Sequence, residues 1–407
     1  MFHKVVLENG IRVVSFPMPE MRSVSVGLWI EAGSRHENLE NNGISHFIEH
    51  LLFKGTEKRS AKKIAEIFDS IGGQINAFTG KEATCFYTKT LSKYLELSID
   101  VLSDIFFHSL INPSEMELEK SVVIEEIHMY EDSPEEIVHD LVTELAWKKS
   151  LGYPILGTLD NIQNMTRKDI VDYKNLHYTP NRVVIAVAGN YDEKKLDKLI
   201  RKYFADWKAD FSKVTYEENL FHAGEQFVEK DTEQAHFCIS YPGLKSKDDL
   251  TYSALALNNI LGGGMSSRLF QEIREKRGLA YSVYTYVTSY KEEGLFTIYG
   301  GINPENYTKV MALLNAEIEK IFHKQPSARE IKNAKEQLKG NFLLGLENTT
   351  SIMSYIGKSE LLWNEIETFE EVIEKIEKID DESIGVVKEK IFAEGETAKV
   401  VIGEVEA

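Results

Sequence analysis

The sequence predicts an α+β protein of two structurally similar domains, each a largely antiparallel sheet packed with helices. The chain has 407 residues, too many for one ordinary core, so two domains of roughly 200 residues each are expected. Short β-rich runs alternate with amphipathic stretches of helical period. The order of these elements in the first half recurs in the second half, which indicates an internal duplication.

The first half opens with a predicted hairpin, because two apolar runs flank Asn9-Gly10, the strongest short hairpin signal. Apolar residues at helical spacing predict helices over 44–53 and 61–71, and Gly72-Gly73 ends the second of them. The remaining elements of this half are expected as strands over 24–30, 74–79 and 84–91, helices over 92–110, 113–131 and 134–148, a buried strand over 182–188 and a helix over 192–206.

A polar, irregular stretch over 211–225 is the predicted linker, because complete elements flank it on both sides. It separates a first domain over residues 1–210 from a second domain over 226–407. The second domain repeats the strand, helix and strand-pair order of the first. Its elements are expected as strands over 236–241, 280–289, 294–299 and 400–402, and helices over 250–260, 266–277 and 304–323.

Composition excludes several classes of protein. The apolar fraction of 43% and the charged fraction of 28% are typical of a globular protein. No run approaches the roughly 18 apolar residues of a membrane span, and the N-terminus has no secretory signal. Cys85 and Cys238 are too few for a disulfide framework or a thiolate metal site. A net charge of −18 argues against nucleic acid as a partner. We therefore expect a cytoplasmic protein that binds neither nucleic acid nor membrane.

The segment from His46 to His50 reads His-Phe-Ile-Glu-His and predicts a metal site. On a helix, residues four apart project from one face, so both imidazoles can bind one ion. Zinc in catalytic sites takes such nitrogen and carboxylate ligands and keeps one position open for water. Glu49, beside the two histidines, then takes the proton of that water. The alternative is a pair of surface histidines, but their apolar neighbours indicate a buried helix, where unpaired polar groups are costly.

A third ligand is expected from the acidic helix over 113–131. Glu119 and Glu126 lie two helical turns apart on one face of it. We expect Glu126 to bind the metal and Glu119 to orient a histidine from behind it. The alternative, a solvated acidic face, would be preferred if His46 and His50 were absent.

The stretch Gly43–Thr56, with the two downstream glutamates, resembles the pitrilysin/insulinase family of metallopeptidases. Within it, the chain is most similar to bacterial members related to the mitochondrial processing peptidase. The resemblance covers essentially the whole chain. It implies Zn2+ held by His46, His50 and Glu126, with Glu49 as the catalytic base. In that family the third ligand follows the second histidine by about 76 residues, as Glu126 does here.

The same resemblance implies how substrate is held. Asn76, Ala77 and Phe78 match the family's substrate-binding edge strand, to which a peptide adds as an extra strand. Arg274 and Tyr281 match an Arg and Tyr pair that helps hold substrate near the zinc, where the Tyr hydroxyl can stabilise an oxyanion. Without the resemblance, an exposed Arg and a packed Tyr would be the better interpretation.

The resemblance also implies the assembly and the activity. Full-length family members are two such halves fused, so this chain is expected to be half of a clamshell and to pair as a homodimer. The implied function is a zinc-dependent endopeptidase that hydrolyses short or unfolded peptides in an enclosed chamber. The alternative is a catalytically silent member that acts as a structural or peptide-binding subunit.

Overall fold

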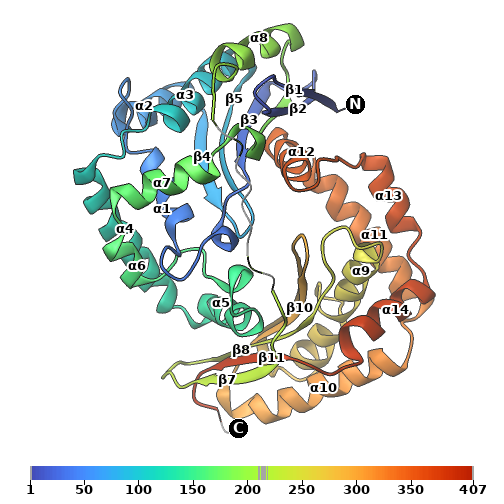
Figure 1. Cartoon of the computed structure of the whole chain (residues 1–407). Helices are drawn as coiled ribbons and strands as arrows, with labels where there is room; N and C mark the ends of the chain where they lie inside the picture. The colour runs from blue at the N-terminus through green and yellow to red at the C-terminus, as the bar shows by residue number, and fades with distance from the viewer. Residues whose placement is uncertain (1, 210, 212–216, 218, 406–407) are drawn as a thin grey trace. The chain divides into compact units, whose positions relative to one another are not determined.

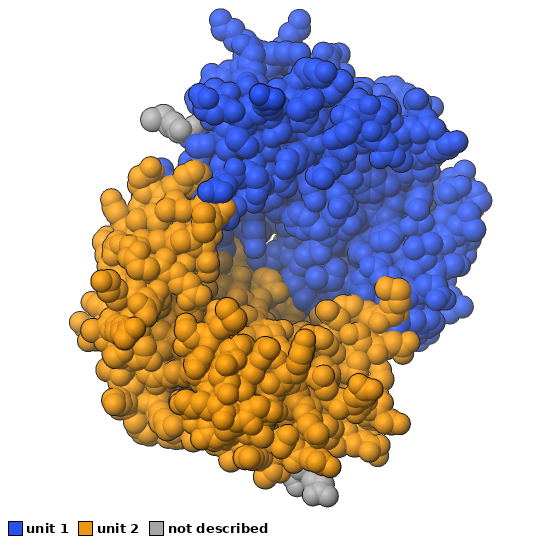
Figure 2. Space-filling model, turned by 180° about the vertical axis from the view of Figure 1, so that it is seen from behind, with its two compact units in different colours: residues 1–128, 153–217, 345–368 blue, residues 129–152, 218–344, 369–407 orange. Residues whose placement is uncertain are grey.

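The computed structural model describes residues 2–209, 211, 217 and 219–405. They form two compact units, coloured separately in Figure 2. The first unit comprises residues 1–128, 153–217 and 345–368, and the second comprises 129–152, 218–344 and 369–407. The predicted linker over 211–225 falls partly on residues 212–216 and 218, which lie outside the described residues.

The first unit is built on a sheet whose strands lie in the order β1, β2, β6, β3, β5, β4 among the described residues. Figure 1 labels these strands except β6. β2 and β6 are parallel, and every other neighbouring pair is antiparallel. The predicted hairpin at Asn9-Gly10 is confirmed, since β1 and β2 pair across it and Gly10 adopts a φ of 95°. The strand bounds are β1 His3–Val6, β2 Arg12–Pro17, β3 Ser23–Ile30, β4 Gln74–Thr79, β5 Thr84–Leu91 and β6 Val183–Gly189.

Helices pack on both faces of this sheet and bury its apolar side chains. One apolar core joins residues of β3, β5 and β6 to α1, α3 and α8. The other face contacts α12, where the Trp29 indole donates to the Met353 sulfur at 3.4 Å. A Cβ at Gly357 would overlap that indole, so glycine permits the close approach of helix and sheet. The helices are α1 Ile44–Leu52, α2 Ala61–Ile71, α3 Leu95–His108, α4 Pro113–Glu131, α6 Leu159–Asn164, α7 Arg167–His177, α8 Glu193–Phe204 and α12 Thr349–Trp363.

The second unit repeats this plan. Its described strands lie in the order β7, β11, β8, β10, β9, with β7 and β11 parallel and the other neighbouring pairs antiparallel. The strands are β7 Gly224–Val228, β8 Ala235–Pro242, β9 Ala280–Ser289, β10 Gly294–Ile302 and β11 Ala398–Ile402. The helices are α5 Pro134–Ala146, α9 Thr251–Leu261, α10 Tyr307–His323, α11 Ala328–Gly345, α13 Phe369–Glu377 and α14 Asp381–Phe392, with a π-helical segment over Phe270–Glu275. That segment lies where a regular helix over 266–277 was predicted.

Apart from β1, the strands of the two sheets match position by position, so the prediction of two structurally similar domains is confirmed. The order β2, β6, β3, β5, β4 corresponds to β7, β11, β8, β10, β9, including the one parallel pair. The two compact units nevertheless do not correspond to two continuous halves of the sequence. α5 belongs with the second sheet and α12 with the first, because each covers the second apolar face of a sheet from the other half. Among the described residues, every helix is too short or too polar to cross a membrane.

Candidate metal centre

The candidate metal centre is built on α1, which packs into the core of the first unit. Its apolar residues, Ile44, Phe47, Ile48, Leu51 and Leu52, are almost completely buried. Because Glu49 and His50 follow His46 by three and four positions, this packing places the three side chains together on the remaining face. His46 is buried and His50 is half-buried.

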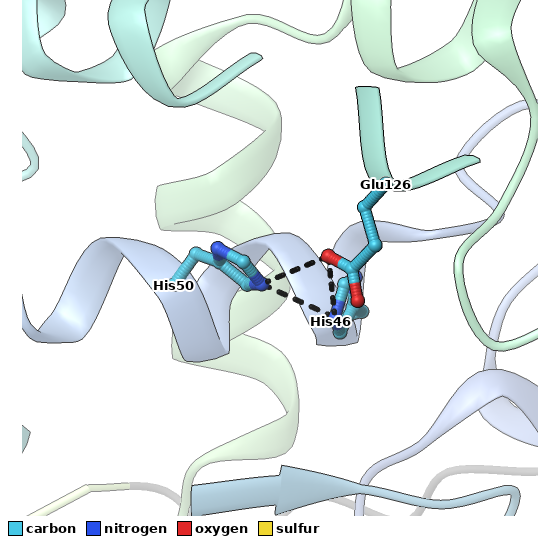
Figure 3. Close-up of side chains that lie close together, drawn as sticks. All are labelled: His46, His50 and Glu126. Carbon is cyan, nitrogen blue, oxygen red and sulfur yellow. Dashed lines mark hydrogen bonds and ion pairs between the residues drawn. The ribbon is translucent and has the colours of Figure 1, made fainter. Parts of the chain in front are cut away.

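Three atoms that can bind a metal converge at this face, as Figure 3 shows. His46 Nε2 and His50 Nε2 lie 3.2 Å apart. Glu126 Oε2, from α4, lies 3.8 Å from the first nitrogen and 3.6 Å from the second. Zinc bonds of 2.0–2.1 Å in a tetrahedron place neighbouring ligand atoms about 3.4 Å apart. The donor types and their separations therefore fit a zinc ion. No other group of three such side chains converges in the part of the chain that the structure describes.

The low pKa of His46 and the hydrogen bond of His50 also suit a cation. Burial, with a smaller effect of the His50 charge, lowers the pKa of His46 to about 4. At neutral pH its ring is therefore uncharged and offers a lone pair. His50 Nδ1 lies 2.8 Å from Glu119 Oε1. In the tautomer with the proton on Nδ1, the Nδ1–H group donates a hydrogen bond to this carboxylate. The lone pair of Nε2 is then directed at His46 and Glu126.

Glu49 stands beside the three converging atoms and accepts a hydrogen bond from a different partner. Its Oε2 receives the Thr79 hydroxyl at 2.6 Å, from the end of β4. Burial raises the pKa of Glu49, although the bond from Thr79 and the charge of His50 oppose this. A carboxylate with a raised pKa is suited to take up a proton and to give it back.

The strand predicted to bind substrate lies at an edge. β4 pairs with β5 on one side and with no other strand among the described residues. The side chains of Asn76 and Phe78 are exposed, while Ala77 between them is half-buried. The outer backbone groups of β4 are thus available to an added strand.

Arg274 and Tyr281 belong to the second unit. The Arg274 guanidinium lies over the Tyr281 ring, 5.5 Å from its centroid, and 4.9 Å from the centroid of Phe270. Tyr281, at the start of β9, is 74% exposed and so free to contact another molecule. The two predicted residues are neighbours, and their role toward the metal centre stays a prediction.

Sequence analysis missed two residues of the centre. Thr79, which contacts Glu49, was seen only as the last residue of a predicted strand. Lys54 Nζ lies 2.5 Å from Glu119 Oε2, on the side of that carboxylate away from His50. The position of Lys54 four residues after His50, just beyond the end of α1, was the available signal.

Comparison with known proteins agrees with this description. Residues 12–159 match the insulinase family (peptidase family M16), and residues 164–338 match the peptidase M16 inactive domain. An uncharacterized zinc protease of Bacillus subtilis is 44% identical, over 97% of this chain and 96% of its own. An uncharacterized zinc protease of Streptomyces coelicolor is 38% identical, over 98% and 89%.

Solved structures share the fold. A protease from Helicobacter pylori superposes with a TM-score of 0.92 at 24% identity, over 99% of both chains. A peptidase M16 inactive domain from Pseudomonas fluorescens superposes with a TM-score of 0.93 at 18% identity, over 100% of this chain and 98% of the other.

Proposed function

Because the chain belongs to the insulinase family of peptidases (M16), we propose that it is a zinc-dependent endopeptidase that hydrolyses short or unfolded peptides in an enclosed chamber. The observation that carries the proposal is the convergence of His46, His50 and Glu126 beside a half-buried, hydrogen-bonded Glu49. The names of the relatives support a zinc protease at the coarser level.

The residues take the following roles in the proposal. His46, His50 and Glu126 hold the zinc ion, and Glu119 keeps the His50 ring in the tautomer that binds it. Zinc, when bound, supplies Lewis acidity, which makes water more acidic and polarises a carbonyl. Glu49 accepts the proton of the attacking water and later delivers it to the leaving amine. The bond from Thr79 holds the Glu49 carboxylate in place during both transfers.

The substrate is proposed to bind as an added strand on β4. Backbone groups of Asn76, Ala77 and Phe78 pair with an extended peptide, which explains a preference for short or unfolded chains. Arg274 and Tyr281 are proposed to contact the same peptide, with the Tyr hydroxyl stabilising charge on the carbonyl oxygen. The exposure of Tyr281 and of the β4 edge supports this assignment.

The assembly and location follow from the resemblance and from the thiols. We propose a homodimer, since one chain corresponds to half of the two-part enzymes of the family. We also propose that the protein works in the cytoplasm. Cys85 and Cys238 are both buried and unpaired with each other, which suits a reducing compartment.

The test compares zinc content and cleavage of an unstructured peptide library for the wild type and two variants. Glu49→Gln is expected to keep zinc and lose cleavage, because it removes the proton acceptor and no metal ligand. Glu126→Gln is expected to lose both zinc and cleavage. The control is Glu125→Gln, which changes the exposed neighbouring glutamate and should retain both zinc and cleavage. A wild type that holds zinc without cutting any peptide would favour the silent, peptide-binding alternative.

A further inference from the structure

Helix α1, which carries both histidines, starts without a side-chain cap. Its first residue, Ile44, follows Gly43, which adopts a φ of 98° and has no side chain to accept a hydrogen bond. The backbone N–H groups of a first helical turn have no partner within the helix. Where that turn is buried, as here, leaving them unpaired is costly, so an acceptor must come from elsewhere.

Glu37 supplies that acceptor. Its Oε2 accepts the backbone N–H of Gly43 at 2.7 Å, and its Oε1 accepts that of Ser45 at 2.8 Å. A third donor, Asn42 Nδ2, reaches Oε2 at 2.8 Å. Glu37 is only 7% exposed, and a carboxylate at the N-terminal end of a helix is favoured by the helix dipole. Burial raises the pKa of Glu37, while the hydrogen bonds from Ser45, Gly43 and Asn42 lower it.

The segment that carries Glu37 is itself anchored on two sides. The Arg35 backbone N–H donates to the Lys81 carbonyl at 2.9 Å, and the Arg35 guanidinium forms a buried ion pair with Glu82. On the other side, Asn42 Nδ2 also donates to the Pro154 carbonyl at 2.8 Å. Lys81 and Glu82 lie in the turn that joins β4 to β5. The carboxylate therefore connects the start of α1 to the same hairpin that presents the edge strand.

The two histidines depend on this connection unequally. His50 has its Nδ1 held by Glu119, so its ring is oriented directly. His46 Nδ1 is buried and has no hydrogen-bond partner among the described residues. On its Nδ1 side the His46 ring therefore has no support like that of His50, and its position depends more on the backbone of the first turn of α1, of which it is the third residue.

We propose that Glu37 is a positioning residue for the metal centre, which holds the first turn of α1 so that His46 Nε2 meets its two partner ligands. This inference rests on the proposed function, because it assigns Glu37 a part in zinc binding. It predicts that changing Glu37 weakens zinc binding beyond any general loss of stability.

The experiment measures the zinc Kd of the full chain by competition with a chromogenic chelator, beside the unfolding temperature. Glu37→Gln preserves size, but its amide nitrogen must face one of the backbone N–H donors. We expect zinc to bind about 10- to 100-fold more weakly, as found for other changes behind metal ligands. Glu37→Asp withdraws the carboxylate and should act in the same direction, which provides a second variant if Glu37→Gln does not fold.

The matched control is Glu360→Gln, which changes a buried carboxylate of the same unit that pairs with Lys4 at 2.9 Å. Glu360 lies in α12, on the face of the sheet opposite to α1. The control variant should lower the unfolding temperature and leave the zinc Kd within about twofold of wild type. The proposal is overturned if Glu37→Gln also binds zinc within twofold, or if Glu360→Gln weakens zinc equally. A wild type that binds no zinc would instead refute the proposed function.

Imidazole nitrogen NMR of the metal-free chain gives a further readout. The Glu37→Gln change should shift the His46 ring signals and leave those of His50 near their wild-type positions. Equal shifts of both rings would show a general disturbance of α1 and contradict a role specific to His46.

Discussion

Replacement of Glu119 tests how strongly the carboxylate behind His50 supports the metal centre. Glu119 is 4% exposed and bonds His50 Nδ1 at 2.8 Å and Lys54 Nζ at 2.5 Å. In Glu119→Ala the His50 N–H loses its acceptor, and the ring is no longer held in the tautomer that directs Nε2 at the metal. In Glu119→Gln an acceptor remains for His50, but the amide nitrogen then faces the Lys54 ammonium.

The size of the effect can be worked out from these contacts. A hydrogen bond to a charged group contributes about 1.5–3 kcal/mol. At about 1.4 kcal/mol per tenfold change, this corresponds to roughly 10- to 100-fold in zinc affinity, the range typical of partners behind metal ligands. We expect Glu119→Ala near the upper end of that range and Glu119→Gln near the lower end.

The assay is zinc competition against a chromogenic chelator at neutral pH, with Lys54→Met as the control. That variant removes the other partner of Glu119 and leaves the bond to His50, so it should change the zinc Kd by less than about threefold. The reasoning is refuted if Glu119→Ala binds zinc within threefold of wild type. It is also refuted if Lys54→Met weakens zinc as much, since Glu119 would then act through Lys54.

Three further predictions concern catalysis, packing and pH. Thr79→Val removes the hydroxyl that holds the proposed base, so it should lower kcat about tenfold or more with little change in zinc content. Thr79→Ser keeps a hydroxyl and should retain most of the wild-type kcat. Equal kcat values for the two variants would contradict a role of the Thr79 hydroxyl in holding Glu49. Gly357→Ala should destabilise the chain by about 1–3 kcal/mol in urea unfolding, because the new methyl overlaps Trp29. Gly340→Ala, in a helix with open space around the new methyl, should instead be neutral or stabilising by up to about 1 kcal/mol. Burial lowers the pKa of His177 to about 3. As the pH falls below 6.5, this histidine is therefore protonated in the unfolded chain but stays neutral in the folded chain. The free energy of unfolding then decreases by about 1.4 kcal/mol per pH unit. His177→Phe should make the stability curve between pH 6.5 and 4.5 shallower by that amount, and an unchanged slope would show that this ring does not remain neutral.

The sequence by itself determined the elements whose signals are local. The spacing of His46, Glu49 and His50 and the apolar residues between them predicted a buried helix with three polar side chains on one face. That prediction holds because helical period and burial act within a few residues. The hairpin at Asn9-Gly10 was recognisable for the same reason, since a two-residue turn sets the register of its own strands.

The match between the two sheets was also visible in the sequence as a repeated order of elements. Hydrophobic pattern orders strands and helices along the chain, and the duplication therefore appeared without any residue identity between the halves. The π-helical segment over Phe270–Glu275 was not predicted, because π-helices are rare and occur mostly as single turns within stretches that otherwise have the pattern of an α-helix.

Only the tertiary structure decided which distant segments cover each other. Local pattern shows that α5 and α12 have apolar faces, but it does not show that each covers a sheet from the other half of the chain. The reason is physical: burial of apolar surface is non-directional, so any apolar helix face suits any apolar sheet face.

In the candidate metal centre, too, some features could be predicted from the sequence and others required the tertiary structure. The two histidines come from one helical turn, and their convergence follows from the sequence. The approach of Glu126 to within 3.8 Å of them, the bond from Thr79 to Glu49 and the capping of α1 by Glu37 join separate elements. Such contacts depend on how helices and strands pack, since a hydrogen bond requires its partners within about 3 Å of each other. The residues proposed to bind the metal and to act as the base could therefore be predicted from the sequence, while the residues that hold them in place were found only in the folded protein.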